Sequence, residues 1–176
     1  MRKLIIKIAF GLLLLTLILG INPAGLASSI SDPGKMIFIN GFGVDVAIDQ
    51  PEYTTGLTAR PPVIKMALQV YNYSQIPVTF DFTTSQRYDF AIYDSRGREV
   101  WRWSDDKGFL QVIGQLILQP GESVVYTAEH VFTDKNGEPM PTDLYTLKGE
   151  LTATGRDFWA PRIMEGKVSF WHRNAQ

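Results

Sequence analysis

The sequence contains no cysteine and only two histidines among its 176 residues. The lack of cysteine excludes disulfides, thiolate nucleophiles, thiolate metal sites and iron–sulfur clusters. His130 and His172 stand far apart, without the spacing of a zinc motif, and the chain has no Gly-x-Ser-x-Gly nucleophile motif. We therefore interpret both histidines as ordinary surface or strand-end residues. The sequence predicts no catalytic residues, no metal site, no cofactor and no enzyme activity.

An excess of basic residues is also missing. The chain has 17 Lys and Arg against 18 Asp and Glu, a net charge of -1, which argues against a nucleic-acid partner. All the charges before Asp32 are basic. Without residues 1–27, 14 basic and 18 acidic residues remain, a net charge of -4. This mildly acidic body favours solubility but indicates no particular partner.

The basic residues at the N-terminus precede an apolar run. Residues 8–21 are uncharged and apolar, and the small residues Gly25 and Ala27 follow. This order is typical of a secretory signal peptide cleaved after Ala27. The run is short for a spanning helix, which needs about 20 residues, although an uncleaved membrane anchor helix is the alternative. Both interpretations predict a secreted or extracytoplasmic body, which contacts a membrane only through the N-terminal segment if that segment is uncleaved.

Helical periodicity is absent after Ile30, and alternation of apolar with polar residues replaces it. The turns at residues 94–97 and 119–122 have the Asp, Pro and Gly residues that tight turns prefer. Strands separated by short turns predict antiparallel sheets, so we expect an all-β, immunoglobulin-like β-sandwich. The strands are expected at residues 65–72, 77–82, 87–93, 98–103, 116–118, 124–128, 145–153 and 167–171, with the first two forming a hairpin.

The region before this sandwich is less regular. Residues 36–40 and 44–48 have the composition of short strands on either side of a Gly41–Gly43 turn. Residues 50–62 are rich in Pro and Gly and are typical of a linker or long loop. The predicted organisation is a leader at 1–27, an N-terminal extension at 28–62 and a β-sandwich domain at 63–176.

Several segments in the middle of the chain carry a family resemblance. They are Gln86-Arg87-Tyr88-Asp89-Phe90, Trp101-Arg102-Trp103-Ser104, Leu118-Gln119-Pro120-Gly121-Glu122 and Tyr145 to Gly149. With them, residues 67–154 resemble the BsuPI-type domain, named for an intracellular serine-proteinase inhibitor of bacilli. The resemblance implies an immunoglobulin-like sandwich, proteinase inhibition and a subtilisin-like serine proteinase as partner. The chain differs from the family's intracellular namesake because its sequence predicts an export signal. The matching residues have a framework character: Gln86, Arg87, Tyr88, Asp89, Phe90, Trp101, Trp103, Ser104, Pro120, Gly121 and Tyr145.

A proteinase-binding segment is expected on an exposed, fairly rigid loop, and two loops have a suitable composition. One follows the paired tryptophans at residues 104–109. The other spans residues 133–141, where two prolines limit the entropy lost on binding. The candidate contact residues are Ser104, Asp105, Asp106, Lys107, Phe109, Lys135, Asn136 and Met140.

Two further features allow more than one interpretation. Asp89 either binds a ligand or metal, or pairs with Arg87 or Arg102 as a structural acid, which we favour because buried polar groups need partners. Trp101 and Trp103 either stack on a sugar or peptide, or pack against the core. The sequence therefore predicts an exported, non-catalytic, protein-binding β-sandwich that inhibits a serine proteinase. The alternative is a cell-envelope structural or carbohydrate-binding module.

Overall fold

The computed structural model describes residues 41–56, 60–134, 136–154 and 164–175. The expected leader, the expected strand at 36–40 and the candidate contact residue Lys135 lie outside this part of the chain. The described residues form an all-β structure without a helix, and so contain no helix that could serve as a membrane span. Its strands are β1 (Phe42–Ile48), β2 (Glu52–Thr55), β3 (Val63–Asn72), β4 (Val78–Phe82), β5 (Tyr88–Tyr93), β6 (Glu99–Arg102), β7 (Gly114–Leu118), β8 (Ser123–Val131), β9 (Asp143–Leu151) and β10 (Glu165–Asn174).

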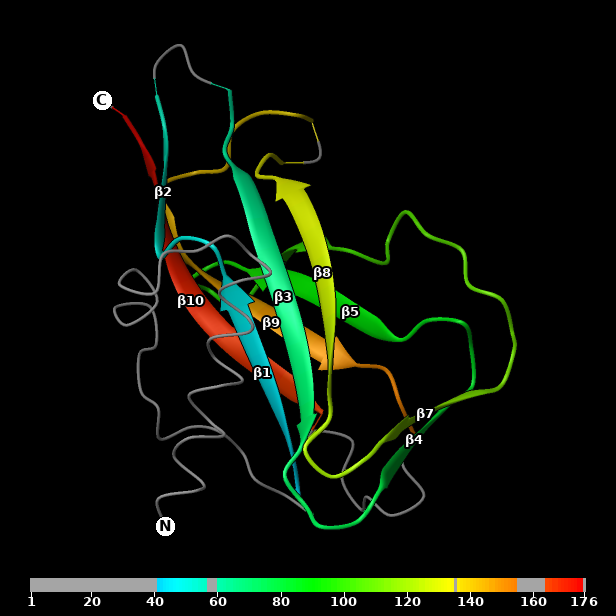
Figure 1. Ribbon diagram of the computed structural model, residues 1–176. Helices are drawn as coiled ribbons and strands as arrows, with labels where there is room; N and C mark the ends of the chain where they lie inside the picture. The colour runs from blue at the N-terminus through cyan, green and yellow to red at the C-terminus, as the bar shows by residue number, and fades with distance from the viewer. Residues whose placement is uncertain (1–40, 57–59, 135, 155–163, 176) are drawn as a thin grey trace, which may run out of the picture.

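The strands form two facing layers and a separate ribbon. One layer is the sheet β1-β3-β8, and the other is the sheet β2-β10-β9-β5-β6. All pairs are antiparallel except β2 with β10, which is parallel. Figure 1 shows the three-stranded sheet in front of the larger one. This arrangement confirms the expected all-β class and agrees with a β-sandwich.

Apolar side chains from both layers fill the space between them. The alternation in β4 and β9 places every second residue in this core, as a half-buried strand requires. Phe80, Phe90 and Leu147 are fully buried there. The layers approach closely where Gly149 pairs with Gly166, because a Cβ on either glycine would lie 2.8 Å from a methyl of Val46.

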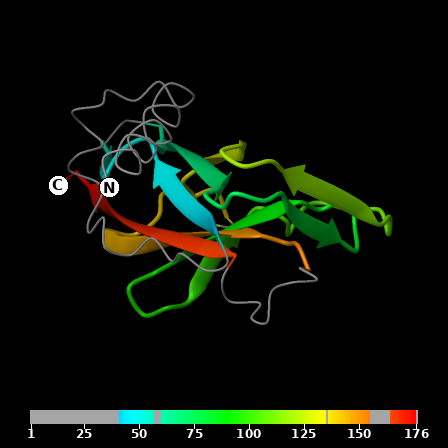
Figure 2. The ribbon, with the colours of Figure 1, turned by 60° about the horizontal axis from the view of Figure 1, so that its bottom comes forward.

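The ribbon of β4 and β7 extends the sandwich at one end. These two strands pair only with each other among the described strands, with Phe82 opposite Gly114. Figure 2 shows the ribbon projecting from the end that lies away from the C-terminus. The expected hairpin between residues 65–72 and 77–82 is therefore wrong: β3 pairs with β1 and β8, and the chain leaves it to form β4 of the ribbon.

Two other local expectations need correction. Of the expected Gly41–Gly43 turn, only Gly41 lies in a turn, with a φ of 85°, because β1 begins at Phe42 and continues through Gly43. Gly43 is required there by the ring of Tyr73, which would lie 2.6 Å from a Cβ at that position. The expected linker at residues 50–62 contains strand β2, which pairs with β10. A strand of four residues is too short for its alternation pattern to reveal this pairing.

The two predicted turns are confirmed. At residues 94–97 the carbonyl of Asp94 accepts a hydrogen bond from the Gly97 N–H at 2.9 Å, and Gly97 has a positive φ of 76°. At residues 119–122 the carbonyl of Gln119 accepts from the Glu122 N–H at 2.9 Å, with Gly121 at a φ of 83°. Such dihedral angles favour glycine over residues with a Cβ.

Candidate functional site in the β6–β7 loop

Asp89 fixes the beginning of the connection between β6 and β7. Its side chain is 5% exposed, and Oδ2 accepts hydrogen bonds from Arg102 Nη1 at 3.0 Å and from Ser104 Oγ at 2.6 Å. Arg102 also pairs with Glu99, and this hydrogen bond lowers the pKa of Glu99. Asp89 is thus a structural acid that holds Ser104, as expected for a buried carboxylate with partners.

Aromatic rings support the same connection from inside. The Tyr88 ring stacks on Trp103 at 4.5 Å and on Tyr126 at 4.7 Å between centroids. Phe109 packs against Trp103 at 6.0 Å, and the ammonium group of Lys107 lies 4.7 Å from the same indole. Trp103 therefore forms part of the core edge and a platform under the loop, which confirms that at least one tryptophan is structural.

The far end of the connection is fixed by the segment that precedes β5. Leu110 donates its N–H to Ser85 Oγ at 2.9 Å, and its carbonyl accepts from the Ser85 N–H at 2.8 Å. The guanidinium group of Arg87 lies directly against Gly114, so that any side chain at Gly114 would collide with it. Arg87 is held in turn by the carbonyl of Thr84 at 2.9 Å and by the ring of Phe82.

We call residues Ser104–Ile113 the β6–β7 loop. Figure 1 shows it as the yellow-green trace that projects at the side of the molecule opposite β2. Ser85 and Asp89 contact the loop itself, and Arg87 and Tyr88 contact its flanking residues Gly114 and Trp103. These four residues lie in a nearly continuous segment that includes the most specific part of the family resemblance. This segment, which we call the loop mount (residues 85–89), thus holds the loop at both ends.

The last part of the β6–β7 loop exposes apolar side chains. Leu110 is 70% exposed, Val112 is 47% exposed and Ile113 is 87% exposed. Gln111, Val112 and Ile113 form no backbone hydrogen bond with any other described residue. We call residues 111–113 the open span. It combines unpaired backbone groups with exposed apolar side chains between two fixed points, which is the arrangement of a binding segment.

Sequence reasoning found only the first part of this site. The structure places Asp105, Asp106 and Lys107 on the surface, with Lys107 bound to Asp106 at 2.6 Å. The open span was missed because a short apolar stretch followed by Gly114 has the pattern of an ordinary strand start. The sequence carries only a weak signal here: between Phe109 and Gly114, only Gln111 is polar, and this composition does not show whether the stretch is exposed.

The second candidate loop, at residues 133–141, has a different character. The Asp134 carboxylate accepts hydrogen bonds from the backbone N–H groups of Asn136 and Glu138, which forms a compact turn with Asn136 exposed. Met140 is buried in the core, so its side chain is not available to a partner. The two candidate loops follow different strands, since residues 104–109 follow β6 and residues 133–141 follow β8.

The remaining framework residues take structural positions. Pro120 and Gly121 form the turn before β8, and Tyr145 is buried against Phe132 and Phe170. Gln86 donates to the carbonyl of Tyr88 at 3.2 Å. Trp101 lies against the His130 ring, 4.3 Å between centroids, so neither expected tryptophan offers two open faces to a sugar.

The two histidines are more deeply embedded than expected. His172 is not a surface residue: it is fully buried, and its Nδ1 donates to the carbonyl of Pro141 at 3.1 Å while Nε2 lies 2.9 Å from Thr55 Oγ1. His130 is partly buried in β8, and burial lowers its pKa to about 4. Neither histidine contacts a serine paired with a carboxylate. Among the described residues, no group of three or more His, Asp or Glu side chains has a metal-binding arrangement.

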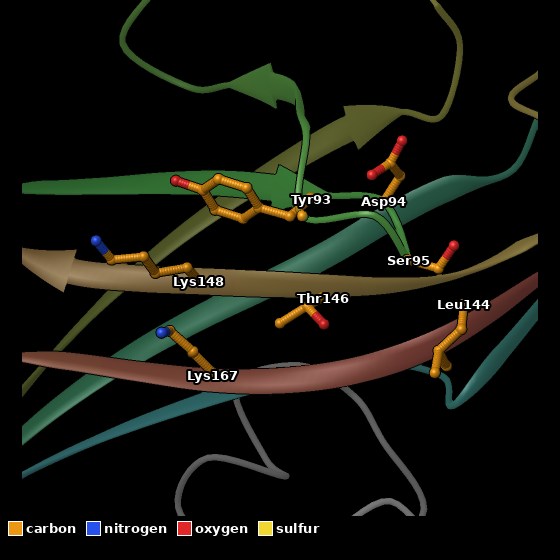
Figure 3. Close-up of a pocket in the computed structure, with 8 residues that line it drawn as sticks. Tyr93, Asp94, Ser95, Leu144, Thr146, Lys148 and Lys167 are labelled. Carbon is orange, nitrogen blue, oxygen red and sulfur yellow. The ribbon is translucent and has the colours of Figure 1, made fainter.

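A surface hollow of about 490 Å³ lies on the outer face of the larger sheet (Figure 3). Tyr93, Thr146, Lys148 and Lys167 line it from three neighbouring strands. Although burial opposes the charge of Lys148, its hydrogen bonds to Glu150 and Glu165 outweigh that effect and raise its pKa. Because its cations already have anionic partners, the hollow offers a ligand less than the open span does.

The described sheets are consistent with a β-sandwich domain, and the β6–β7 loop lies on its surface, hydrogen-bonded near both ends and apolar in its exposed last part. A family model described as BsuPI, intracellular proteinase inhibitor, matches residues 52–156. The chain therefore belongs to the BsuPI family, which confirms the resemblance found in the sequence. The match begins at β2, earlier than residue 67, and covers the whole loop mount and the whole β6–β7 loop.

Comparisons with other proteins add little. No curated protein sequence is similar enough to be counted as a relative. Among solved structures, the CARDB domain of a Pyrococcus furiosus protein, solved in complex with di-metal ions, is 12% identical with a TM-score of 0.39, and covers 79% of this chain and 100% of that chain. The sporulation control protein Spo0M from Bacillus subtilis is 13% identical with a TM-score of 0.40, covering 78% of this chain and 51% of its own. A β-glucosidase from Listeria innocua is 15% identical with a TM-score of 0.39, over 75% of this chain and 16% of its own. Likenesses at this level support no conclusion about function.

Proposed function

We propose that the protein is an exported inhibitor of serine proteinases and that it binds its target through the β6–β7 loop. Membership of the BsuPI family supports inhibition, because that family is described as a proteinase inhibitor. The export signal that the sequence predicts at residues 1–27 supports a target outside the cytoplasmic membrane. The protein acts by binding and not by catalysis.

The observation that carries this proposal is the open span between its two fixed ends. Serine proteinases bind an extended peptide segment by main-chain hydrogen bonds, as in strand addition, with side-chain pockets that give specificity. Residues 111–113 have free backbone groups for this purpose. The contacts of Leu110 with Ser85 and of Gly114 with Arg87 hold the span before binding, so less conformational entropy is lost on association.

The test is a titration of subtilisin with protein expressed from the full 176-residue sequence. A variant in which Gln111, Val112 and Ile113 are replaced by Gly-Ser-Gly should lose inhibition. The matched control replaces the exposed turn residues Asn136 and Glu138 by Gly and Ser, leaves Gly137 in place because its φ of 84° favours glycine, and should retain inhibition. Absence of inhibition of subtilisin, chymotrypsin, elastase and trypsin by a large molar excess of the unaltered protein would contradict the proposal. Equal loss in both variants would argue against the loop.

The carbohydrate-binding alternative has less structural support. It depended on Trp101 and Trp103, whose indoles lie against His130 and Tyr88. The exposed described tryptophan is Trp171, where Arg173 lies over the ring. A cell-wall pull-down that is unaffected by Trp171→Ala would count further against this alternative.

A further inference from the structure

We propose that Ile113 is the residue that enters the primary specificity pocket of the target proteinase, so that the protein selects enzymes whose pocket is apolar. This inference rests on the proposed function and assigns its specificity. The β6–β7 loop has free backbone groups only in part of its length, and these define where an enzyme can bind.

The hydrogen bonds of Leu110 exclude it as the primary residue. A serine proteinase binds the carbonyl of that residue in its oxyanion hole, so this oxygen has to be free. In Leu110 both the carbonyl and the N–H are already bonded to Ser85, at 2.8 and 2.9 Å. Leu110 is 70% exposed, but its backbone is committed to holding the loop.

The choice between Val112 and Ile113 follows from the length of the bound segment. An inhibitor pairs as an extended strand with the enzyme over the primary residue and the residues before it. If Val112 were primary, a three-residue strand would include Leu110, whose backbone groups are taken. If Ile113 is primary, the strand is the open span itself, in which all three residues have no bond to another described residue.

The exposure of the side chains agrees with this assignment. Ile113 is 87% exposed, the most exposed of the large apolar residues in the described chain. It stands directly before Gly114, which pairs with Phe82 and lies against Arg87. Gly114 therefore fixes the position of the peptide bond that follows Ile113, so the loop presents this bond to the enzyme in a defined place.

The chemistry of an isoleucine side chain defines the partner. An apolar pocket gains from burying it, whereas a trypsin-type pocket contains a carboxylate that isoleucine would leave buried and unpaired. We therefore expect the protein to inhibit proteinases with apolar primary pockets and to spare trypsin-like enzymes.

The test replaces the apolar side chain at residue 113 by a basic one and measures which proteinases the variant inhibits. Ile113→Arg should weaken inhibition of subtilisin or elastase about 100-fold and should create inhibition of trypsin, because a change at one hot-spot residue alters affinity by that order. The matched control is Ile117→Arg, since Ile117 is also exposed but lies within β7, outside the open span. Its inhibition constants should change less than about threefold. Unchanged thermal unfolding of both variants shows that they fold.

The outcomes separate this inference from the proposed function. If the Gly-Ser-Gly loop variant loses inhibition while Ile113→Arg keeps the preference of the unaltered protein, the assignment of Ile113 is overturned and the inhibitory loop stands. If Ile113→Arg and Ile117→Arg behave alike, the assignment is also overturned. If the unaltered protein inhibits none of the enzymes, the proposed function itself fails.

Discussion

Replacement of Asp89 by Asn tests whether the loop mount connects stability with function. The change keeps the shape of the side chain but removes the charge that accepts from Arg102 at 3.0 Å and from Ser104 at 2.6 Å. Hydrogen bonds to a charged group contribute about 1.5–3 kcal/mol each. Arg102 is partly exposed and keeps Glu99 as a partner, which reduces the loss. We expect the free energy of unfolding to fall by about 2–4 kcal/mol.

The same substitution should weaken inhibition, because a neutral amide binds Ser104 and Arg102 less strongly and the start of the loop is held less firmly. Renewed ordering of this segment on binding costs about 1–2 kcal/mol, or roughly tenfold in the inhibition constant. Urea unfolding monitored by tryptophan fluorescence and a proteinase titration measure the two effects. The matched control is Asp106→Asn, an ion-paired aspartate of the same loop whose side chain is exposed. The reasoning is refuted if Asp89→Asn unfolds at the same urea concentration as Asp106→Asn.

Three further changes test the core, the histidine and the loop. Burial lowers the pKa of His130 from 6.5 to about 4, so the unfolded state binds more protons than the folded state between these pH values. The free energy of unfolding should therefore fall by about 1–2 kcal/mol as the pH decreases from 6.5 to 4, after allowance for the partial exposure of the ring. In urea unfolding measured over this pH range, His130→Leu should abolish that decrease. Gly149→Ala should cost about 1–3 kcal/mol in thermal unfolding, since its Cβ would meet Val46 at 2.8 Å, whereas Gly108→Ala, with open space around it, should be neutral. Ser85→Ala should cost about 0.5–1.5 kcal/mol and weaken inhibition a few-fold in a titration, because one of the two hydrogen bonds between Ser85 and Leu110 is lost.

Alternation along the chain predicted most of the strands but not all of their partners. The pattern in 77–82 correctly indicates β4, because Val78, Phe80 and Phe82 share the buried face. It carries no information on pairing, and a polar connection of a few residues suggested a hairpin with the preceding strand. The ribbon β4–β7 instead joins residues more than 30 positions apart, a pairing set by tertiary packing and not by local sequence.

The candidate site shows the same division between local and long-range information. Loop composition correctly indicated the surface position of Asp105 to Lys107, and burial with partners correctly identified Asp89 as structural. The open span could not be predicted from the residues alone. Its character depends on Ser85 taking the hydrogen bonds of Leu110, and the two residues are 25 positions apart in sequence.

In the proposed function, the loop mount holds the loop and the open span contacts the proteinase, and these different roles lead to a general expectation for this protein. Asp89 and Ser85 contact the loop and also the folded body, so substitutions there change the free energy of unfolding and the inhibition constant together. Ile113 contacts solvent, so substitutions there change inhibition while leaving unfolding the same. When the inhibition constants of all variants are plotted against their free energies of unfolding, the variants of Asp89 and Ser85 should therefore fall on one line and those of Ile113 on another. Changes at Asp89 and Ser85 alter how firmly the loop is held, whereas changes at Ile113 alter the side chain that the loop presents. A single line through all variants would mean that the loop binds only through the integrity of the fold, and it would remove the reason to assign specificity to any one side chain.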